Sequence, residues 1–255
     1  MTGVECFAIT DAGGQPGENE DAVVLDAAGG IFVVADGLGG RPGGAIASWT
    51  AAEALHSRLK AAPVEVRLTP EVMQDAMECA NAAVRARAAA DPLLEGMGAA
   101  IAGLAVGGMH CAVAHAGDCR VYLLRGGSIE QLTKDHTLVA ELVARNHLSP
   151  EGARHHPLRN VLARCAGTNE RIVADTLNLE LRMGDLLLMA TDGLSKGLEP
   201  EGIRAVLENE TERPLGDVAK ALMHEALKDG PGDNVTIVLV RMAGLGPDGG
   251  EAAHE

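Results

Sequence analysis

Pairs of glycine residues between short apolar runs constrain the fold of this chain more than any other feature. Three such pairs occur, at residues 29–30, 107–108 and 126–127, and apolar segments of strand length flank each pair. Glycine supplies the positive φ that a tight turn requires, so each pair predicts a β-hairpin. Repeated hairpins indicate largely antiparallel sheets and argue against a parallel nucleotide-binding sheet.

The remaining pattern adds helices to these strands. The predicted strands cover residues 4–10, 21–27, 31–36, 98–106, 110–118, 119–124, 128–132, 185–192 and 234–242. Helical spacing of apolar residues predicts a helix over 43–61, another from Pro70 to about Asp91, and a third from Leu215 that ends before Gly230. Apolar sheets with helices outside give the α+β class. We expect one domain over residues 1–243 and a flexible tail over 244–255.

The charge and cysteine content exclude several classes of function. The chain of 255 residues has 36 acidic and 21 basic residues, a net charge of -15 that disfavours nucleic acid and anionic lipid as partners. The sequence shows no signal peptide, and no apolar stretch approaches the ~20 residues of a membrane helix. Five scattered cysteines argue against a disulfide framework and a thiolate zinc site. We therefore predict a cytoplasmic protein with no nucleic-acid and no membrane partner.

Acidic residues gather at the ends of the predicted strands. These positions are Glu20, Asp21, Asp36, Asp118, Asp192 and Asp233. An Asp-Gly pair at a strand end is by itself most often a turn. A carboxylate at the tip of a buried strand is nevertheless unfavourable unless it is paired or metal-bound. Because Mg²⁺ and Mn²⁺ prefer oxygen ligands, the group of acids is a candidate site for two divalent ions.

Six segments, in order along the chain, resemble motifs of the metal-dependent Ser/Thr protein phosphatases of type 2C, in their bacterial form. They are ENEDA (18–22), IFVVADGLGGRPGGAIAS (31–48), HAGDCRVYLL (115–124), LTKDHTLV (132–139), GDLLLMATDGL (184–194) and GDNVTIVLV (232–240). Each motif alone is weak evidence, but six in the same order are specific. The resemblance implies an αββα sandwich, in which helices flank two antiparallel sheets.

The resemblance also implies a role for each acid. Asp36 would bridge two Mn²⁺ or Mg²⁺ ions, one completed by Glu20 and the Gly37 carbonyl and the other by Asp192 and Asp233. Asp118 and Asp192 would hold a weaker third ion. Asp21 and Asn234 would support these ligands from behind. Asp36, Asp192 and Asp233 would thereby form the catalytic group.

The implied reaction is hydrolysis of phosphoserine and phosphothreonine in proteins, by a water or hydroxide that bridges the two ions. Phosphorylated substrates of a Ser/Thr kinase would be the partners. Where the family has a phosphate-binding arginine, this chain has Pro16. Arg41, and Arg159 and Arg164 in the flap region (about 136–165), are the candidate replacements.

Two other functions fit the same residues. Loss of the phosphate-binding arginine suggests a pseudophosphatase, or a regulator that binds phosphoproteins without efficient catalysis. A metal phosphohydrolase acting on small phosphates is the third hypothesis. Metal-dependent release of phosphate from a phosphothreonine peptide would discriminate among them.

Overall fold

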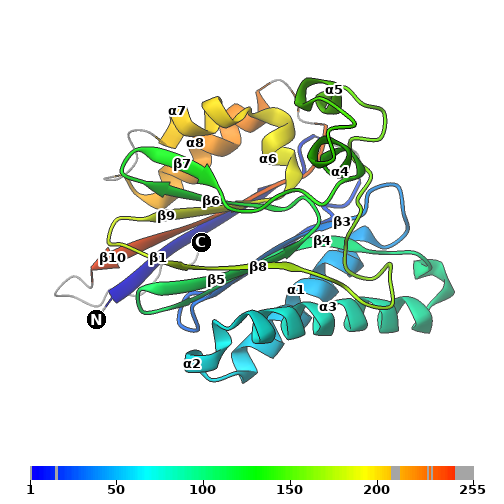
Figure 1. Cartoon of the computed structure of the whole chain (residues 1–255), viewed down its shortest axis with the longest axis horizontal. Helices are drawn as coiled ribbons and strands as arrows, with labels where there is room; N and C mark the ends of the chain where they lie inside the picture. The colour runs from blue at the N-terminus through cyan, green and yellow to red at the C-terminus, as the bar shows by residue number, and fades with distance from the viewer. Residues whose placement is uncertain (1, 15–16, 208–212, 229, 231, 245–255) are drawn as a thin grey trace.

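The fold is a sandwich of two five-stranded antiparallel sheets with helices on both outer faces (Figure 1). The computed structural model describes residues 2–14, 17–207, 213–228, 230 and 232–244. One sheet has the order β1 (Thr2–Asp11), β10 (Val235–Gly244), β9 (Leu186–Ala190), β6 (Arg120–Arg125) and β7 (Ser128–Gln131). The other has the order β2 (Asp21–Asp26), β3 (Ile31–Gly37), β4 (Ala99–Gly107), β5 (His110–Ala116) and β8 (Asp175–Glu180). The predicted α+β class is confirmed.

The predicted hairpins are present at all three glycine pairs. β2 pairs with β3, β4 with β5, and β6 with β7, each antiparallel. Gly30 closes its turn at φ 64°, with its N–H donated to Ala27 O at 3.2 Å. A residue with a Cβ is disfavoured at that φ, so the glycine is required there.

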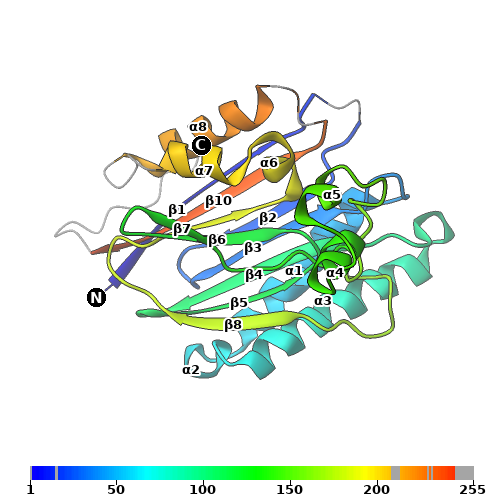
Figure 2. The ribbon, with the colours of Figure 1, turned by 45° about the horizontal axis from the view of Figure 1, so that its top comes forward.

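Helices cover each sheet on its outer side (Figure 2). α1 (Gly44–Ala61) and α3 (Pro70–Ala90) lie against the β2–β8 sheet, with α2 (Val64–Arg67) and the 3₁₀ turn η1 (Pro92–Leu94) beside them. α6 (Asp192–Gly197), α7 (Pro200–Leu207) and α8 (Leu215–Leu227) cover the β1–β7 sheet. α3 begins as its sequence predicts, because Thr69 Oγ1 accepts the Val72 N–H and Pro70 occupies the first turn.

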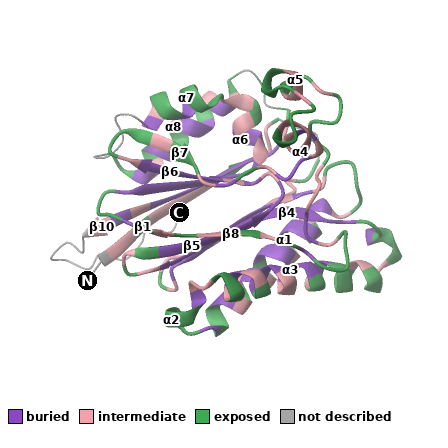
Figure 3. Cartoon of the chain, viewed as in Figure 1, coloured by how far each residue is buried: buried purple, intermediate pink, exposed green. Residues whose placement is uncertain are grey.

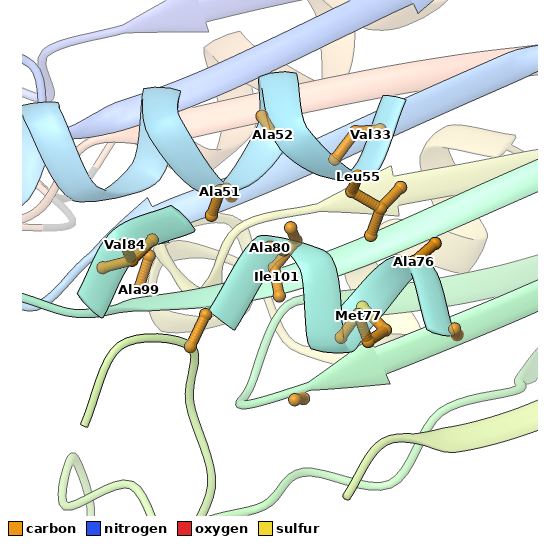
Figure 4. Close-up of a cluster of buried hydrophobic side chains, with 14 of the residues drawn as sticks. Val33, Ala51, Ala52, Leu55, Ala76, Met77, Ala80, Val84, Ala99 and Ile101 are labelled. Carbon is orange, nitrogen blue, oxygen red and sulfur yellow. The ribbon is translucent and has the colours of Figure 1, made fainter. Parts of the chain in front are cut away.

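Three apolar layers hold these parts together (Figure 3). β3 contributes to two of these layers: Ile31 and Val33 face the helices, whereas Phe32 and Val34 face the other sheet. This explains why its sequence is a continuous apolar run. Under α1 and α3 the side chains are small, including Ala51, Ala76 and Ala80, so the two helices pack closely on the sheet around Leu55 and Ile101 (Figure 4).

Several elements differ from the sequence-based prediction. The edge strand β8 was not predicted, because its alternating apolar positions are few and only half-buried. The flap contains two short helices, α4 (Leu138–Ala144) and α5 (Pro150–Arg154), each with a hydroxyl N-cap. The strand predicted over 185–192 ends at Ala190, and Asp192 begins α6. Of the predicted tail, Gly244 is the last residue of β10 and residues 245–255 lie outside the described part of the chain.

Candidate metal centre

Acids from both sheets meet at one end of the sandwich. Asp21 and Asp36 are direct partners in the β2–β3 ladder, and Asp118 follows β5 in the same sheet. Asp192 and Asp233 come from the other sheet, at the end of β9 and just before β10. Burial, followed by the charges of the other four aspartates, raises the pKa of Asp36 well above its usual range. The five carboxylates therefore form one interacting group.

Asp21 is held by two threonine hydroxyls. Its Oδ2 accepts hydrogen bonds from Thr191 Oγ1 at 2.8 Å and Thr236 Oγ1 at 2.7 Å. Desolvation outweighs these bonds and raises its pKa to about 7. The two threonines come from β10 and the end of β9, so the hydroxyls join Asp21 on one sheet to strands of the other. Asp21 was predicted to stand behind the metal ligands, and this arrangement suits that role.

Asn234 ties the Glu20 segment to the start of β10. Its Oδ1 accepts the Glu20 N–H at 2.8 Å and its Nδ2 donates to Ala12 O at 3.1 Å. The Asn234 N–H is donated to Asp233 Oδ1 at 2.9 Å. The one residue thus holds both the backbone of Glu20 and the carboxylate of Asp233, and burial raises the Glu20 pKa with Asp233 as the next contribution.

Glycines allow the chain to approach itself closely at this site. A Cβ at Gly44 would overlap the Glu20 carboxylate, and a Cβ at Gly37 would overlap the Gly44 backbone. The Gly37 N–H donates to Glu20 O at 3.0 Å, which joins the end of β3 to the Glu20 backbone. The glycine-rich segment after Asp36 therefore brings Glu20 and the end of β3 together, as a ligand pair to one ion would require.

Asp118 is partly buried, and its surroundings raise its pKa to about 8. Desolvation is the main cause, with the charges of Asp192 and Asp135 next. Among the neighbours that lower it is the ammonium of Lys196. The charge of Asp192 therefore acts on the Asp118 carboxyl. These are the two residues that the family resemblance predicts to hold the third ion.

A lysine that the sequence analysis did not consider lies among these acids. Lys196 Nζ is 2.5 Å from Asp192 Oδ2 and 2.6 Å from Asp233 Oδ2. The two carboxylates raise the pKa of Lys196 despite its burial. Its i, i+4 spacing from Asp192 on α6 was the available sequence signal. No local sequence pattern indicates that Asp233 lies nearby, because it is 37 positions away in the chain.

The donor chemistry of the site fits divalent cations. All candidate ligands are oxygens, and the Oδ1 atoms of Asp21 and Asp192 are buried without a hydrogen-bond partner. Within the described ranges, however, no three His, Cys, Asp or Glu side chains are already arranged around one point as metal ligands would be. The position between Asp192 Oδ2 and Asp233 Oδ2 is occupied by the Lys196 ammonium.

The hydrogen bonds of two candidate phosphate-binding arginines, Arg41 and Arg164, go to groups outside the carboxylate cluster. Arg164 is bound to Asp175, with Nη1 2.6 Å from Oδ1. Arg159 is exposed in the flap, and Arg41 donates to Gly96 O at 3.0 Å. Pro16 is outside the described residues.

The segment that resembles the family's fourth motif has a structural role. Asp135 accepts two bonds from Arg120, at 2.9 and 2.7 Å, and the ring of His136 stacks on that of His115 at 4.4 Å. His136 N–H and O bind the backbone of Gly117 and Ala163. These contacts fix the start of the flap beside the turn that carries Asp118.

Comparisons with known proteins agree with this geometry. A family model described as "Protein phosphatase 2C" matches residues 13–229. The chain is 35% identical over 233 residues to the serine/threonine protein phosphatase PstP of Mycobacterium tuberculosis, covering 91% of this chain but 44% of PstP. It is 32% identical over 243 residues to the protein phosphatase PhpP of Streptococcus pneumoniae, covering 94% and 98% of the two chains.

A solved structure of the PstP catalytic domain with two manganese ions superposes with a TM-score of 0.83 at 30% identity, covering 96% of this chain and 100% of that one. The chain belongs to the protein phosphatase 2C family, so the predicted family and sandwich fold are confirmed. It spans less than half the length of PstP. No helix in the described ranges is long and apolar enough to cross a membrane.

Proposed function

We propose that this protein is a metal-dependent phosphatase that hydrolyses phosphoserine and phosphothreonine in proteins. The observation that carries the proposal is the buried group of carboxylates whose members raise one another's pKa and include oxygens without partners. Such a group is stable in its ionised form only with added positive charge. The relatives named as serine/threonine phosphatases, and the PstP structure with two manganese ions, support the assignment.

The candidate ligands divide into two sets that share Asp36. Glu20 and the Gly37 carbonyl would hold one Mn²⁺ or Mg²⁺ ion, and Asp192 and Asp233 the other. Asp118 would join Asp192 at a weaker third position, while Asp21 and Asn234 orient the ligands through the hydrogen bonds described above. When bound, two such ions neutralise phosphate charge and lower the pKa of water toward neutrality.

The protein itself contributes orientation and charge. Asp36, Asp192 and Asp233 fix the catalytic centre between the sheets, and burial keeps bulk water from screening their interactions. Among the candidate phosphate-binding groups, Arg41 is favoured over Arg164, because the Asp175 carboxylate already neutralises Arg164. Arg159 is the alternative from the flap. A guanidinium suits this role because its donors match two phosphate oxygens.

The expected setting follows from the same features. All five cysteines are free, and three of them are buried, which suits a reducing compartment and supports a cytoplasmic location. Residues 1–243 would form the phosphatase domain. Its substrates would be the phosphorylated targets of a Ser/Thr kinase.

The test is release of phosphate from a phosphothreonine peptide with Mn²⁺ and with EDTA. Release with Mn²⁺, its loss in EDTA and its return on re-addition of metal are expected. Equal release in EDTA after dialysis would contradict the two-metal site. Binding of the phosphopeptide without release would favour the regulatory alternative, and hydrolysis confined to small phosphate esters would favour the third hypothesis.

A further inference from the structure

The ammonium of Lys196 lies at the position of one proposed metal ion. Its Nζ is 2.5 Å from Asp192 Oδ2 and 2.6 Å from Asp233 Oδ2, so both oxygens face the same cation. These are the two aspartates that would complete the second ion site. The Lys196 side chain is 27% exposed, so it reaches inward from α6 while keeping a route to solvent.

An ammonium and a divalent ion cannot share this position. Carboxylate oxygens bind Mg²⁺ at about 2.0–2.1 Å, and a second positive charge at hydrogen-bonding distance from the same oxygens would repel the ion. Binding of an ion between these two carboxylates therefore requires the Lys196 ammonium to leave its position. The flexible four-carbon stem of a lysine can swing outward without unwinding its helix.

We propose that Lys196 is an intramolecular counter-ion that competes with the metal ion for Asp192 and Asp233. Loading of this half of the site exchanges an ammonium for a divalent cation, whereas no lysine or arginine of the described residues contacts the Glu20 carboxylate in the other half. The inference rests on the proposed two-metal function. It adds that the second ion binds more weakly than the first because of a residue of this chain.

The competition has opposite consequences with and without metal. Without metal, Lys196 offsets the repulsion between two carboxylates, and its loss leaves them uncompensated. With metal, the Lys196 ammonium has to be displaced, and substitution of Lys196 removes the free-energy cost of that displacement. We expect removal of the ammonium to tighten the second site at least tenfold, which corresponds to about 1.4 kcal/mol.

The experiment is a calorimetric Mn²⁺ titration of the complete chain and of Lys196→Met. Lys196→Arg keeps the charge, and Lys220→Met removes a matched charge from an exposed position of α8. Lys196→Met should bind the second ion at least tenfold more tightly, while the two controls bind as the parent does. In EDTA, Lys196→Met should melt below the parent, and in saturating Mn²⁺ this order should disappear or reverse.

Unchanged or weaker second-site binding by Lys196→Met overturns the inference. So does a Lys196→Met protein that stays unfolded in saturating Mn²⁺, because a competitor is dispensable once the metal is bound. The proposed function fails separately, if the parent binds no Mn²⁺ and releases no phosphate. If the parent is an Mn²⁺-dependent phosphatase and Lys196→Met binds the second ion with the affinity of the parent, the competition is excluded and the proposed function stands.

Discussion

Raising the pH from 6.5 to 8.0 should destabilise the metal-free protein and leave the Mg²⁺-loaded protein almost unaffected. Asp21 and Asp118 have pKa values raised to about 7 and about 8 by burial and by neighbouring acids. A carboxyl with a raised folded-state pKa stabilises the fold below its unfolded pKa, near 4, and loses that stability as the pH rises through the folded value. The window starts at 6.5, the ordinary pKa of histidine, because burial lowers the pKa of His115 and His136 below it.

The magnitude follows from proton linkage. Between pH 6.5 and 8.0 the folded protein gives up most of the protons on these two carboxyls, which the unfolded chain lost near pH 4. At about 1.4 kcal/mol per pH unit and proton, the two groups together lose about 2 kcal/mol of unfolding free energy. For a domain of this size that lowers Tm by about 4–8 °C.

Thermal unfolding followed by circular dichroism in EDTA and in saturating Mg²⁺ measures the effect. Bound metal requires ionised ligands, so the stabilisation by Mg²⁺ should grow as the pH rises. Asp118→Asn serves as the control, because a neutral amide at that position should remove the larger part of the pH dependence. A metal-free Tm that stays constant or rises over this window would refute the reasoning.

Three further outcomes test individual residues. Asp36→Asn should lose both high-affinity Mn²⁺ ions in a calorimetric titration, because it is the shared ligand, whereas Asp118→Asn should keep two ions while turnover drops severely. Thr236→Val removes a 2.7 Å donor to a buried carboxylate and should lower the free energy of unfolding by about 1–3 kcal/mol in denaturant titrations. Arg41→Ala should raise KM for a phosphothreonine peptide about tenfold with little change in kcat, while Arg159→Ala changes KM less than threefold; the opposite ranking would assign phosphate binding to the flap.

Much of the fold could be predicted from local sequence because local chemistry determines it. A glycine pair specifies a hairpin whatever surrounds it, and Thr69 and Pro70 begin α3 through bonds within one turn. β8 escaped prediction for the opposite reason. It is an edge strand whose partner, β5, supplies most of its stabilisation, so its own residues carry little periodic signal.

The same distinction applies to the site. The acids could be found in the sequence because each one ends or begins an apolar strand. Thr191 and Thr236 could not, since two threonines next to aspartates are ordinary until the sheets bring both hydroxyls to Asp21. Lys196 likewise requires Asp233, 37 positions away in the chain, before its role becomes visible.

The division of the acids between two sheets links metal binding to the packing of the sandwich. Asp21 and Asp36 belong to one sheet, and Asp192 and Asp233 adjoin the ends of β9 and β10 in the other. The apolar layer around Phe32, between the sheets, determines how far apart they lie. Ions that bind ligands from both sheets bind the folded state and not the unfolded chain, so they stabilise the sandwich by mass action. In the metal-free protein the hydroxyls of Thr191 and Thr236 connect the two sheets at Asp21, whereas Lys196 connects Asp192 and Asp233 within one sheet. If Lys196 competes with the second ion as proposed, metal binding exchanges a link within one sheet for a link between the two sheets.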